Sequence, residues 1–432
     1  MAIKTLHITN HYHPTSGGIR IFYQALLEAA DRHRREVRLV VPGKKDSMEK
    51  VGAFGRIYTI AAPPCPVFDS RYRLLLPHLY ALPYPSALRK ILQQEQPDVV
   101  EVCDKFALSC VPSVLRRNWI KGVSPAVLVG MSCERLDDNV SAYISASRFA
   151  RSLANWYLKK NYVTRFDCHI SNSDYTAGEL LRALVNRPEV QVHVRPMGVH
   201  RGGFSPSRRG ESAREKLLRG ISVASGSATS PRLLLYVGRL SPEKNIDILV
   251  DMMEILAVES SVEYHLLFAG DGPRAAWLKK IADHPTPKRI HLLGHIASRE
   301  DLADLYANCD ALVHPNPREP FGIAPLEAMA SGLPVVAPDA GGVLSYANPR
   351  NAWLVEPAGW GLAAGVRDVF ADPVSRAVKI DQALRTAANF DWPQVAAAFF
   401  ELYDALHKRF RNVGDVPAGV QASSEIYPSA NL

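Results

Sequence analysis

The stretch Leu233-Leu-Leu-Tyr-Val-Gly-Arg-Leu-Ser-Pro-Glu-Lys244 decides the fold class of this chain. Its apolar run predicts a buried strand, the glycine predicts a tight turn, and a helical pattern follows over residues 246–256. A strand, a glycine turn and a helix in this order form the repeating unit of open α/β sheets. Because anionic ligands bind at the carboxyl ends of strands in such sheets, Arg239 and Lys244 are predicted to lie at a ligand site.

Strand and helix patterns alternate along both parts of the chain. In the first part the predicted strands are residues 3–9, 37–41, 99–103, 126–130, 168–171 and 192–195. In the second part they are residues 233–238, 265–269, 290–294, 311–314, 334–337 and 352–355. Helical patterns separate these strands, so we predict two doubly wound parallel sheets.

The chain of 432 residues exceeds the size of one ordinary hydrophobic core. Residues 201–231 are rich in Gly, Ser and Pro, and we interpret them as an interdomain linker with a short helix. The predicted division is a first domain over residues 1–200, a second over 201–390, an amphipathic terminal helix over 391–411 and a disordered tail over 412–432.

Composition indicates a soluble globular protein, with 47% hydrophobic and 22% charged residues. The six cysteines show neither a C-x2-C pair nor a zinc-ligand spacing, so we expect reduced thiols in a cytoplasmic enzyme. The first residues lead into a strand pattern without the features of a signal peptide. No uninterrupted apolar segment of about 20 residues is present to span a bilayer.

The net charge of +8 predicts an anionic partner. Nucleic acid is not expected, because no motif interleaves aromatic with basic residues. Anionic lipid suits the basic residues of the first part, which lie at 32–35, 116–117, Arg151 and 159–160. We therefore expect peripheral contact with the inner face of the cytoplasmic membrane, the alternative being a solvated charged face.

Two carboxylates lie eight positions apart in Glu319-Pro-Phe-Gly-Ile-Ala-Pro-Leu-Glu327. If a helix begins near Pro325, Glu327 lies in its first turn and Glu319 at the loop mouth, so both can face a polyhydroxylated ligand. An isolated pair of this kind is more often a helix cap and a surface charge. Together with Arg239 and Lys244, whose charges suit a diphosphate, the pair predicts a nucleotide-sugar site.

This arrangement resembles the retaining glycosyltransferases of family 4, which have the GT-B fold, and the resemblance extends from Ile3 to about Leu406. Supporting motifs occur in the expected order at residues 11–18, 170–174, 195–199, 204–206, 268–273, 293–296, 328–336 and 341–342. The resemblance implies two Rossmann-like domains facing each other across a cleft, and a terminal helix that crosses back onto the first domain. The loop at 318–323 looks most like that of bacterial mannosyltransferases that use GDP-mannose, although related enzymes use UDP-glucose or UDP-galactose.

The resemblance also implies donor-site roles for individual residues. Arg239 and Lys244 would neutralise the departing diphosphate, Glu319 would accept hydrogen bonds from the donor sugar, and Glu327 would hold the ribose hydroxyls. Backbone groups are expected to complete the donor site at Gly17, Gly18, Gly238, His295, Ile296, Phe321, Gly322 and Ile323. For Gly17 and Gly18 a plain strand-to-helix turn is the alternative.

The acceptor side is expected at the loop of residues 131–138. Cys133 occupies a place where relatives with a similar run carry a histidine, and a thiol cannot replace the hydrogen bonding and proton sharing of an imidazole. Glu134 and Arg135 are further candidates, the alternative being an ion pair between them. Tyr72 and Arg73 are candidates for holding an acceptor phosphate.

No two aspartates stand in a D-x-D relation, so we predict no required metal and no cofactor beyond the nucleotide-sugar substrate. An NAD-dependent dehydrogenase is a rival interpretation, but no G-x-G-x-x-G follows the first strand. A nucleotide-binding module without catalysis is a second rival. It leaves the paired glutamates without a role.

Overall fold

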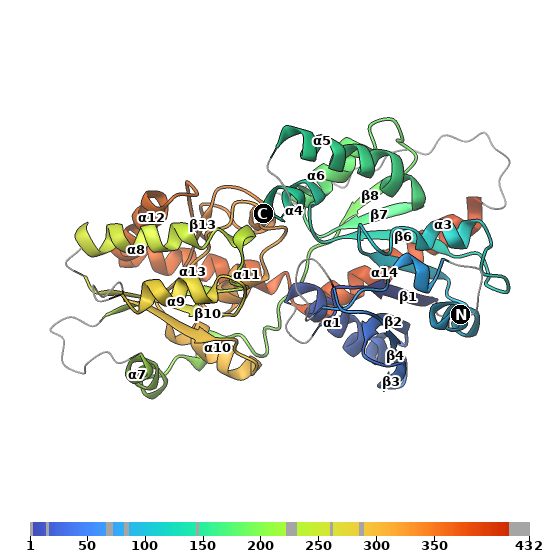
Figure 1. The fold of residues 1–432 in the computed structure, drawn as a ribbon. Coiled ribbons are helices and arrows are strands. Elements are labelled where there is room, and N and C mark those ends of the chain that lie inside the picture. Colours follow the sequence, from blue (N-terminus) through green and yellow to red (C-terminus); the bar gives the residue numbers. More distant parts are fainter. Residues whose placement is uncertain are drawn as a thin grey trace.

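The computed structural model describes residues 3–13, 17–65, 72–81, 86–143, 147–221, 231–259, 262–284 and 289–413. In these residues the chain forms two α/β halves side by side, each built on its own sheet (Figure 1). The predicted fold class, two doubly wound α/β layers, is confirmed.

The N-terminal half contains an eight-stranded sheet in the order β3-β4-β2-β1-β5-β6-β7-β8. Its strands are β1 (Lys4–Thr9), β2 (Glu36–Gly43), β3 (Ser47–Val51), β4 (Gly55–Ala61), β5 (Val99–Cys103), β6 (Val127–Ser132), β7 (Cys168–Ser171) and β8 (Gln191–Val194). Its helices are α1 (Gly18–His33), α2 (Ala87–Glu95), α3 (Val111–Arg116), α4 (Leu136–Tyr143), α5 (Arg148–Tyr157) and α6 (Asp174–Ala183), with short turns η1 (Pro77–Leu79), η2 (Leu158–Tyr162) and η3 (Val163–Arg165). The strand order reverses between β1 and β5, which creates a crevice at their carboxyl ends.

The C-terminal half contains a six-stranded parallel sheet in the order β11-β10-β9-β12-β13-β14. Its strands are β9 (Arg232–Val237), β10 (Tyr264–Ala269), β11 (Ile290–Gly294), β12 (Ala311–Val313), β13 (Val335–Pro338) and β14 (Trp353–Val355). Its helices are α7 (Glu211–Gly220), α8 (Asp247–Glu259), α9 (Ala275–Ala282), α10 (Arg299–Asn308), α11 (Ile323–Ala330), α12 (Gly359–Ala371) and α13 (Pro373–Ala388), with turns η4 (Pro206–Arg208), η5 (Pro242–Lys244) and η6 (Gly342–Ser345). Here the order reverses between β9 and β12.

The structure corrects the predicted sheet in one respect, because the N-terminal sheet is not wholly parallel. Strands β3 and β4 were not predicted, and β3 runs antiparallel to β4 at the edge. The side chains of β3 are mostly exposed, so its sequence Ser-Met-Glu-Lys-Val lacks the apolar run of a buried strand. Central parallel strands such as β9 and β10 are buried on both faces, which explains continuous apolar runs such as Leu233–Leu235.

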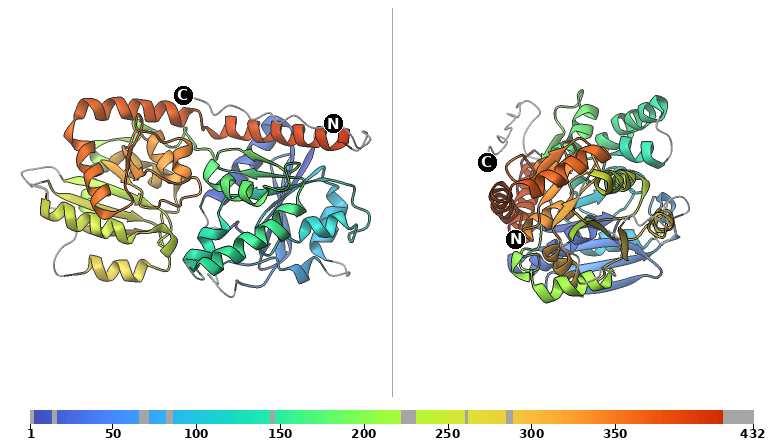
Figure 2. Two further views of the ribbon diagram at one scale, coloured as in Figure 1. Left: turned by 90° about the horizontal axis from the view of Figure 1, so that it is seen from above. Right: turned by 90° about the vertical axis from the view of Figure 1, so that its left-hand side faces the viewer.

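A terminal helix, α14 (Trp392–Val413), lies along the N-terminal half (Figure 2). The Tyr403 hydroxyl donates a 2.6 Å hydrogen bond to the buried carboxylate of Glu101 in β5, and Arg35 pairs with Asp404. Glu101 also bonds His7 of β1 at 2.9 Å and accepts from the Tyr23 hydroxyl at 3.0 Å. These bonds join the end of the chain to the first sheet.

Some predicted features lie outside the described residues, namely the tail beyond residue 413, residues 222–230 of the linker and residues 14–16 of the motif at 11–18. The loop predicted at this motif, which ends in Gly17 and Gly18, is called the glycine-rich loop below. The short helix expected in the linker is α7. Within the described part of the chain, we find no helix whose length and hydropathy suit a membrane span.

Candidate active site

A partly buried ion pair forms the centre of the site in the C-terminal half. Lys244, in the η5 turn that follows β9, donates to both carboxylate oxygens of Glu319, at 2.9 and 2.8 Å. Asn316 also donates to this carboxylate, at 3.1 Å. Burial by itself would raise the pKa of Glu319, but the Lys244 charge and these hydrogen bonds lower it to about 2. Glu319 is therefore an anion at every physiological pH.

His314 was not predicted as a site residue. Its Nε2 lies 3.7 Å from the Glu319 carboxylate, and burial lowers its pKa to about 4, so the imidazole is neutral near pH 7. His314 and Asn316 directly follow β12, beside the point where the order of the sheet reverses. The position of polar residues at the carboxyl end of a predicted strand was the signal that could have identified them.

The loop before α11 owes its shape to glycines. Gly322 has φ +88°, in the left-handed region, and its carbonyl accepts from the Tyr346 hydroxyl. The Gly342 N–H donates to the Glu319 carbonyl at 2.7 Å, and a Cβ on Gly342 would lie 1.9 Å from the Pro320 oxygen. Helix α11 begins at Ile323, so its N-terminal N–H groups follow immediately after this loop.

The start of α11 corrects the predicted position of Glu327. The helix begins two residues earlier than predicted, which places Glu327 in the second turn. Glu327 is 6% exposed and accepts a 3.0 Å hydrogen bond from Tyr306, a residue that was not predicted. Burial raises the pKa of Glu327 to about 7, although the Tyr306 hydrogen bond opposes the shift.

Two motifs of the N-terminal half meet this loop. A Cβ on Gly18 would lie 2.8 Å from the Ile323 side chain, so the glycine-rich loop packs against the start of α11. The Ser173 hydroxyl, from the predicted motif at 170–174, donates to the Pro320 carbonyl at 2.5 Å. Gly17 directly precedes α1. The structure thus brings the glycine-rich loop and the Glu319–Glu327 segment together.

Arg239 and Tyr72 meet across the two halves. The Arg239 guanidinium carbon lies 5.7 Å from the centroid of the Tyr72 ring, and the His13 ring lies 5.0 Å from the same ring. Arg73 instead donates to the Ala62 carbonyl at 2.5 Å, which fixes the local backbone. Tyr72 and Arg73 are the two acceptor candidates in this segment. Tyr72 lies beside Arg239, which is predicted to bind the diphosphate, whereas Arg73 holds the loop backbone.

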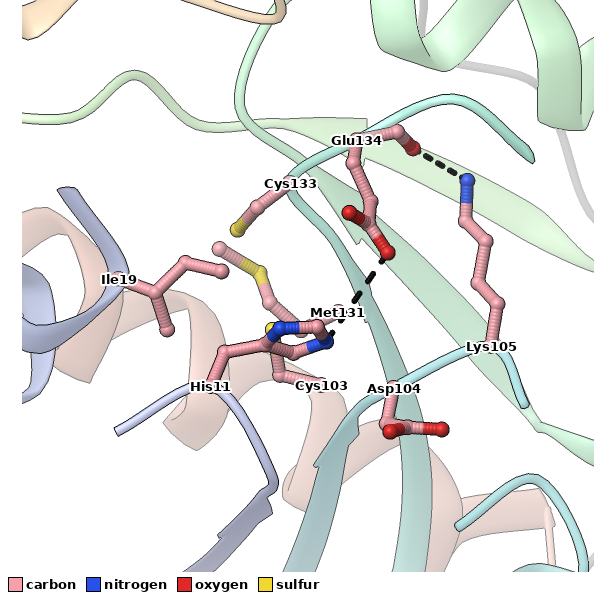
Figure 3. A pocket seen from close by; sticks show the side chains of 8 residues that line it. All are labelled: His11, Ile19, Cys103, Asp104, Lys105, Met131, Cys133 and Glu134. Carbon is pink, nitrogen blue, oxygen red and sulfur yellow. Dashed lines mark hydrogen bonds and ion pairs between the residues drawn. The ribbon is translucent and has the colours of Figure 1, made fainter. Parts of the chain in front are cut away.

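A small pocket lies at the carboxyl ends of β1, β5 and β6, at the point where the order of the N-terminal sheet reverses (Figure 3). It is lined by His11, Ile19, Cys103, Asp104, Lys105, Met131, Cys133 and Glu134. The His11 Nε2 lies 3.9 Å from the Glu134 carboxylate. The Lys105 ammonium donates to the Glu134 carbonyl and, at 2.7 Å, to the carboxylate of Glu179.

The pocket contains residues that sequence reasoning missed. Lys105 is 1% exposed, so its pairing with Glu179 compensates the cost of burying an ammonium group. The neighbouring thiol of Cys133 and burial together raise the pKa of Cys103, which is therefore a neutral thiol. Lys105 could have been identified as a site candidate from the sequence, because it lies two residues beyond the predicted strand at 99–103.

Arg135 does not pair with Glu134, so that alternative is wrong. Its guanidinium bonds Asp137 at 2.5 Å, approaches Asp138 at 3.4 Å and lies 4.5 Å from the centroid of the Tyr175 ring. These contacts join the start of α4 to α6. The Glu134 carboxylate is directed toward His11 in the pocket instead (Figure 3).

Two family profiles match this chain. The "Glycosyl transferase 4-like domain" matches residues 17–198, and "Glycosyl transferases group 1" matches residues 221–387. The matches cover both halves of the fold, including Gly18 and the Glu319–Glu327 segment. The chain belongs to glycosyltransferase family 4.

This family 4 glycosyltransferase is similar along most of its length to a curated relative from Mycobacterium tuberculosis, a GDP-mannose-dependent alpha-(1-6)-phosphatidylinositol dimannoside mannosyltransferase. The two are 26% identical over 405 residues, which are 94% of this chain and 97% of the relative. Among solved structures, sucrose-phosphate synthase from Thermosynechococcus elongatus has a TM-score of 0.69 at 20% identity, over 94% of this chain and all of that one. Anabaena HepE in complex with UDP and glucose has a TM-score of 0.65 at 20% identity, over 93% and 100% of the two chains. These likenesses show the GT-B fold.

The predicted base contact of this glycosyltransferase lies at the end of β11. The His295 side chain is exposed and Ile296 packs partly against the core. Gly238 and Gly270 lie at the ends of neighbouring strands, where a Cβ on Gly270 would lie 1.9 Å from the Gly238 oxygen. In the described residues, His, Cys, Asp and Glu form no cluster of three or more that suits a metal ion.

Proposed function

We propose that this glycosyltransferase moves a hexose from a nucleotide sugar to an acceptor hydroxyl, with retention of configuration and without a metal. The observation that carries the proposal is the Lys244–Glu319 pair, which lies at the loop leading into α11 and within reach of the glycine-rich loop of the other half. A cation, an anion and a helix N-terminus in one place suit a diphosphate joined to a sugar.

The proposed chemistry separates the diphosphate from the anomeric carbon. Lys244 and Arg239 stabilise the charge that develops on the leaving oxygen, together with N–H groups at the start of α11. As the bond from the anomeric carbon to the diphosphate breaks, the acceptor oxygen bonds to the same face of that carbon. The acceptor proton passes to the departing diphosphate, while Glu319 accepts hydrogen bonds from hydroxyls of the sugar.

Glu327 is proposed to bind the ribose of the donor. Its carboxylate is buried and has one hydroxyl partner, Tyr306, so oxygen lone pairs remain for two ribose hydroxyls. The backbone at His295 and Ile296 is proposed to contact the base, and the N–H groups of Gly17 and Gly18 to contribute to the diphosphate site.

For the donor we propose GDP-mannose, because the form of the loop at 318–323 matches mannosyltransferases and the relative described above is named for GDP-mannose. UDP-glucose or UDP-galactose is the alternative, favoured by the similarity to HepE, which was solved with UDP and glucose. Incubation with each nucleotide sugar, with release of the nucleoside diphosphate as the readout, tests the choice. Turnover of a UDP-sugar alone would refute mannose.

The acceptor is proposed to be a lipid or a cell-envelope glycan at the inner face of the cytoplasmic membrane. The pocket at His11, Cys133 and Glu134 would receive its hydroxyl, since it lies on the N-terminal side, next to the helix that follows the glycine-rich loop. A thermal-shift panel with GDP, UDP, ADP and NAD separates the rival functions. Stabilisation by a nucleoside diphosphate with no hydrolysis or transfer from any nucleotide sugar would favour a non-catalytic binding protein.

We expect transfer to continue in excess EDTA, because cationic side chains and a helix N-terminus take the place that a divalent ion has in other donor sites. The measurement is the initial rate with and without chelator, using protein freed of metal beforehand. Loss of turnover that manganese or magnesium restores would contradict metal independence.

A further inference from the structure

Helix α5 carries an exposed apolar face. Phe149 is 78% exposed, Leu153 54% and Trp156 56%, and the spacing of four and then three residues places them on one side of the helix. Ala154, on the opposite side, is buried in the core of the N-terminal half. In Figure 1, α5 lies at the upper edge of that half, so its apolar face is an outer surface of the molecule.

The same segment is strongly basic. Residues 148–166 contain Arg148, Arg151, Lys159, Lys160 and Arg165 and no acidic residue. Arg148, Lys159 and Lys160 are exposed. Large apolar side chains flanked by cations are typical of helices that lie in the interface of an anionic bilayer.

The other basic clusters predicted from the sequence differ from this one. Arg35 pairs with Asp404 of α14, and Arg116 pairs with Asp167 at 2.5 Å. Arg117 stacks over the ring of Trp119 at 5.3 Å. In those clusters Arg35, Arg116 and Arg117 already contact anionic or aromatic side chains of the chain itself. The α5 segment is the cluster in which cations surround a face of three exposed apolar side chains.

The position of α5 relates this surface to the proposed acceptor pocket. The Tyr157 hydroxyl, at the end of α5, donates to the carbonyl of Lys105, which lines the pocket, at 2.8 Å. Helix α4, which precedes α5, begins two residues after Glu134, and its last residue Tyr143 donates to Glu243 of the C-terminal half at 2.6 Å. Helix α5, which carries the exposed apolar face, therefore lies near both the pocket and the junction of the two halves.

We infer that the exposed face of α5 is the surface by which this protein docks on an anionic lipid bilayer. Phe149, Leu153 and Trp156 enter the boundary between headgroups and acyl chains, while Arg148 and the Lys159–Lys160 pair contact anionic headgroups. The role of this docking rests on the proposed function: the bound protein presents a membrane-borne acceptor to the pocket of His11 and Glu134. The docking itself requires no donor and is measured separately.

Sedimentation of the full chain with vesicles tests the inference. We expect binding to phosphatidylcholine vesicles that contain phosphatidylglycerol, and at least about tenfold weaker partitioning of a Phe149→Ser, Leu153→Ser, Trp156→Ser variant, because its apolar contact area is lost. Trp360→Ser is the matched control, since Trp360 is 62% exposed on α12 in the other half. It should partition like the wild type.

The charge contribution is tested with Lys159→Gln, Lys160→Gln, for which we expect roughly tenfold weaker partitioning at low salt and a smaller difference at high salt. Lys279→Gln, Lys280→Gln changes another exposed lysine pair, on α9 in the other half, and should have no effect. All variants should release nucleoside diphosphate from the donor at the wild-type rate without vesicles, which shows that they are folded.

Three results would overturn the inference: no binding of the wild type to anionic vesicles, wild-type binding by the apolar triple variant, or a wild-type dimer in sedimentation velocity that this variant converts to monomer. The last would assign the face to a second copy of the chain. If the wild type binds vesicles through α5 but releases no nucleoside diphosphate from any donor, the docking surface stands and the proposed function is wrong.

Discussion

Glu319 and Glu327 show how two identical side chains eight positions apart acquire different properties. Glu327 is buried and Glu319 is partly buried, and this desolvation favours the neutral acid in each case. Glu319 has an ammonium partner in Lys244 and a pKa of about 2, whereas Glu327 has only a hydroxyl partner in Tyr306 and a pKa of about 7. The first is a permanent anion, and the second titrates near physiological pH.

We expect Lys244→Ala and Arg239→Ala each to lower kcat by about 100-fold or more, because each removes a preorganised cation from the leaving diphosphate. The measurement is steady-state release of nucleoside diphosphate. Lys279→Ala, on the exposed face of α9, is the control and should turn over normally. Turnover near the wild-type rate in both site variants would refute the diphosphate assignment.

The raised pKa of Glu327 predicts a pH-dependent stability. The folded protein holds the Glu327 proton more tightly than the unfolded chain does, with a pKa of about 7 against a model-peptide value of 4.5. Its contribution is therefore complete below about pH 4.5 and is lost as the pH rises through 7, a difference of about 3 kcal/mol. Urea unfolding of the wild type and Glu327→Gln from pH 5 to 8 measures it, and we expect the variant to gain relative stability as the pH rises. Parallel pH profiles for the two proteins would contradict the shift.

The two glutamates should also differ in binding. Glu327→Ala should weaken the affinity for the free nucleoside diphosphate by about 1–3 kcal/mol, because the ribose hydroxyls lose a charged acceptor. Glu319→Ala should leave that affinity unchanged and depress transfer, because its proposed partner is the sugar. Calorimetry and the transfer assay measure the two effects, and equal losses of affinity would show that the roles are misassigned.

At the scale of the element, the helix α11 begins where glycines allow the preceding loop to turn. Gly322 takes a left-handed conformation, and Gly342 of the neighbouring turn packs directly on the Pro320 carbonyl. The loop that carries Glu319 is thus shaped by a second loop, more than 20 residues later in the chain.

We expect Gly342→Ala to destabilise the C-terminal half by about 1–3 kcal/mol and to weaken donor binding, because its Cβ would meet backbone that has to move. Thermal unfolding and nucleotide titration measure the two effects. Gly17→Ala has no atom within 4 Å of the new Cβ and should leave the melting temperature unchanged. Equal melting temperatures for Gly342→Ala and the wild type would show that the loop is not held as described.

At the scale of the whole molecule, α14 closes the N-terminal half with a few specific bonds. The Tyr403 hydroxyl reaches the fully buried Glu101, whereas the next residue, Asp404, pairs with Arg35 near the surface. The Glu101 carboxylate oxygen that loses the Tyr403 donor is left unsatisfied in the core, because His7 and Tyr23 bond the other oxygen, whereas a partly exposed ion pair is replaced by water.

We therefore expect Tyr403→Phe to lower the free energy of unfolding by about 1–3 kcal/mol, and Asp404→Ala to lower it by about 1 kcal/mol or less. Urea unfolding of the two variants measures the difference, and circular dichroism should show unchanged helix content. A larger loss for Asp404→Ala would mean that the surface pair, rather than the buried bond, holds the helix.

The sequence by itself determined the two sheets, the parallel strands buried within them, and the order of the motifs. Most positions of those strands are apolar, because both faces of the central strands are buried, and an apolar run is a local property that can be read from the chain. The sequence also predicted that Arg239, Lys244 and Glu319 lie at the ends of strands or loops. The edge strand β3 could not be predicted in this way, because its exposed side chains show no apolar pattern.

Only the tertiary structure decided which of these residues meet. His314 and Asn316 meet Glu319 within the segment that follows β12, and Tyr306 of α10 meets Glu327 of α11. Lys105 meets Glu134 because β5 and β6 end at the same edge of the sheet, and it also meets Glu179 of α6. The pKa values of the two glutamates follow from burial and partners, which no spacing in the sequence specifies. The exposure of Phe149, Leu153 and Trp156 was likewise decided by packing, because the same helical spacing also suits a buried face.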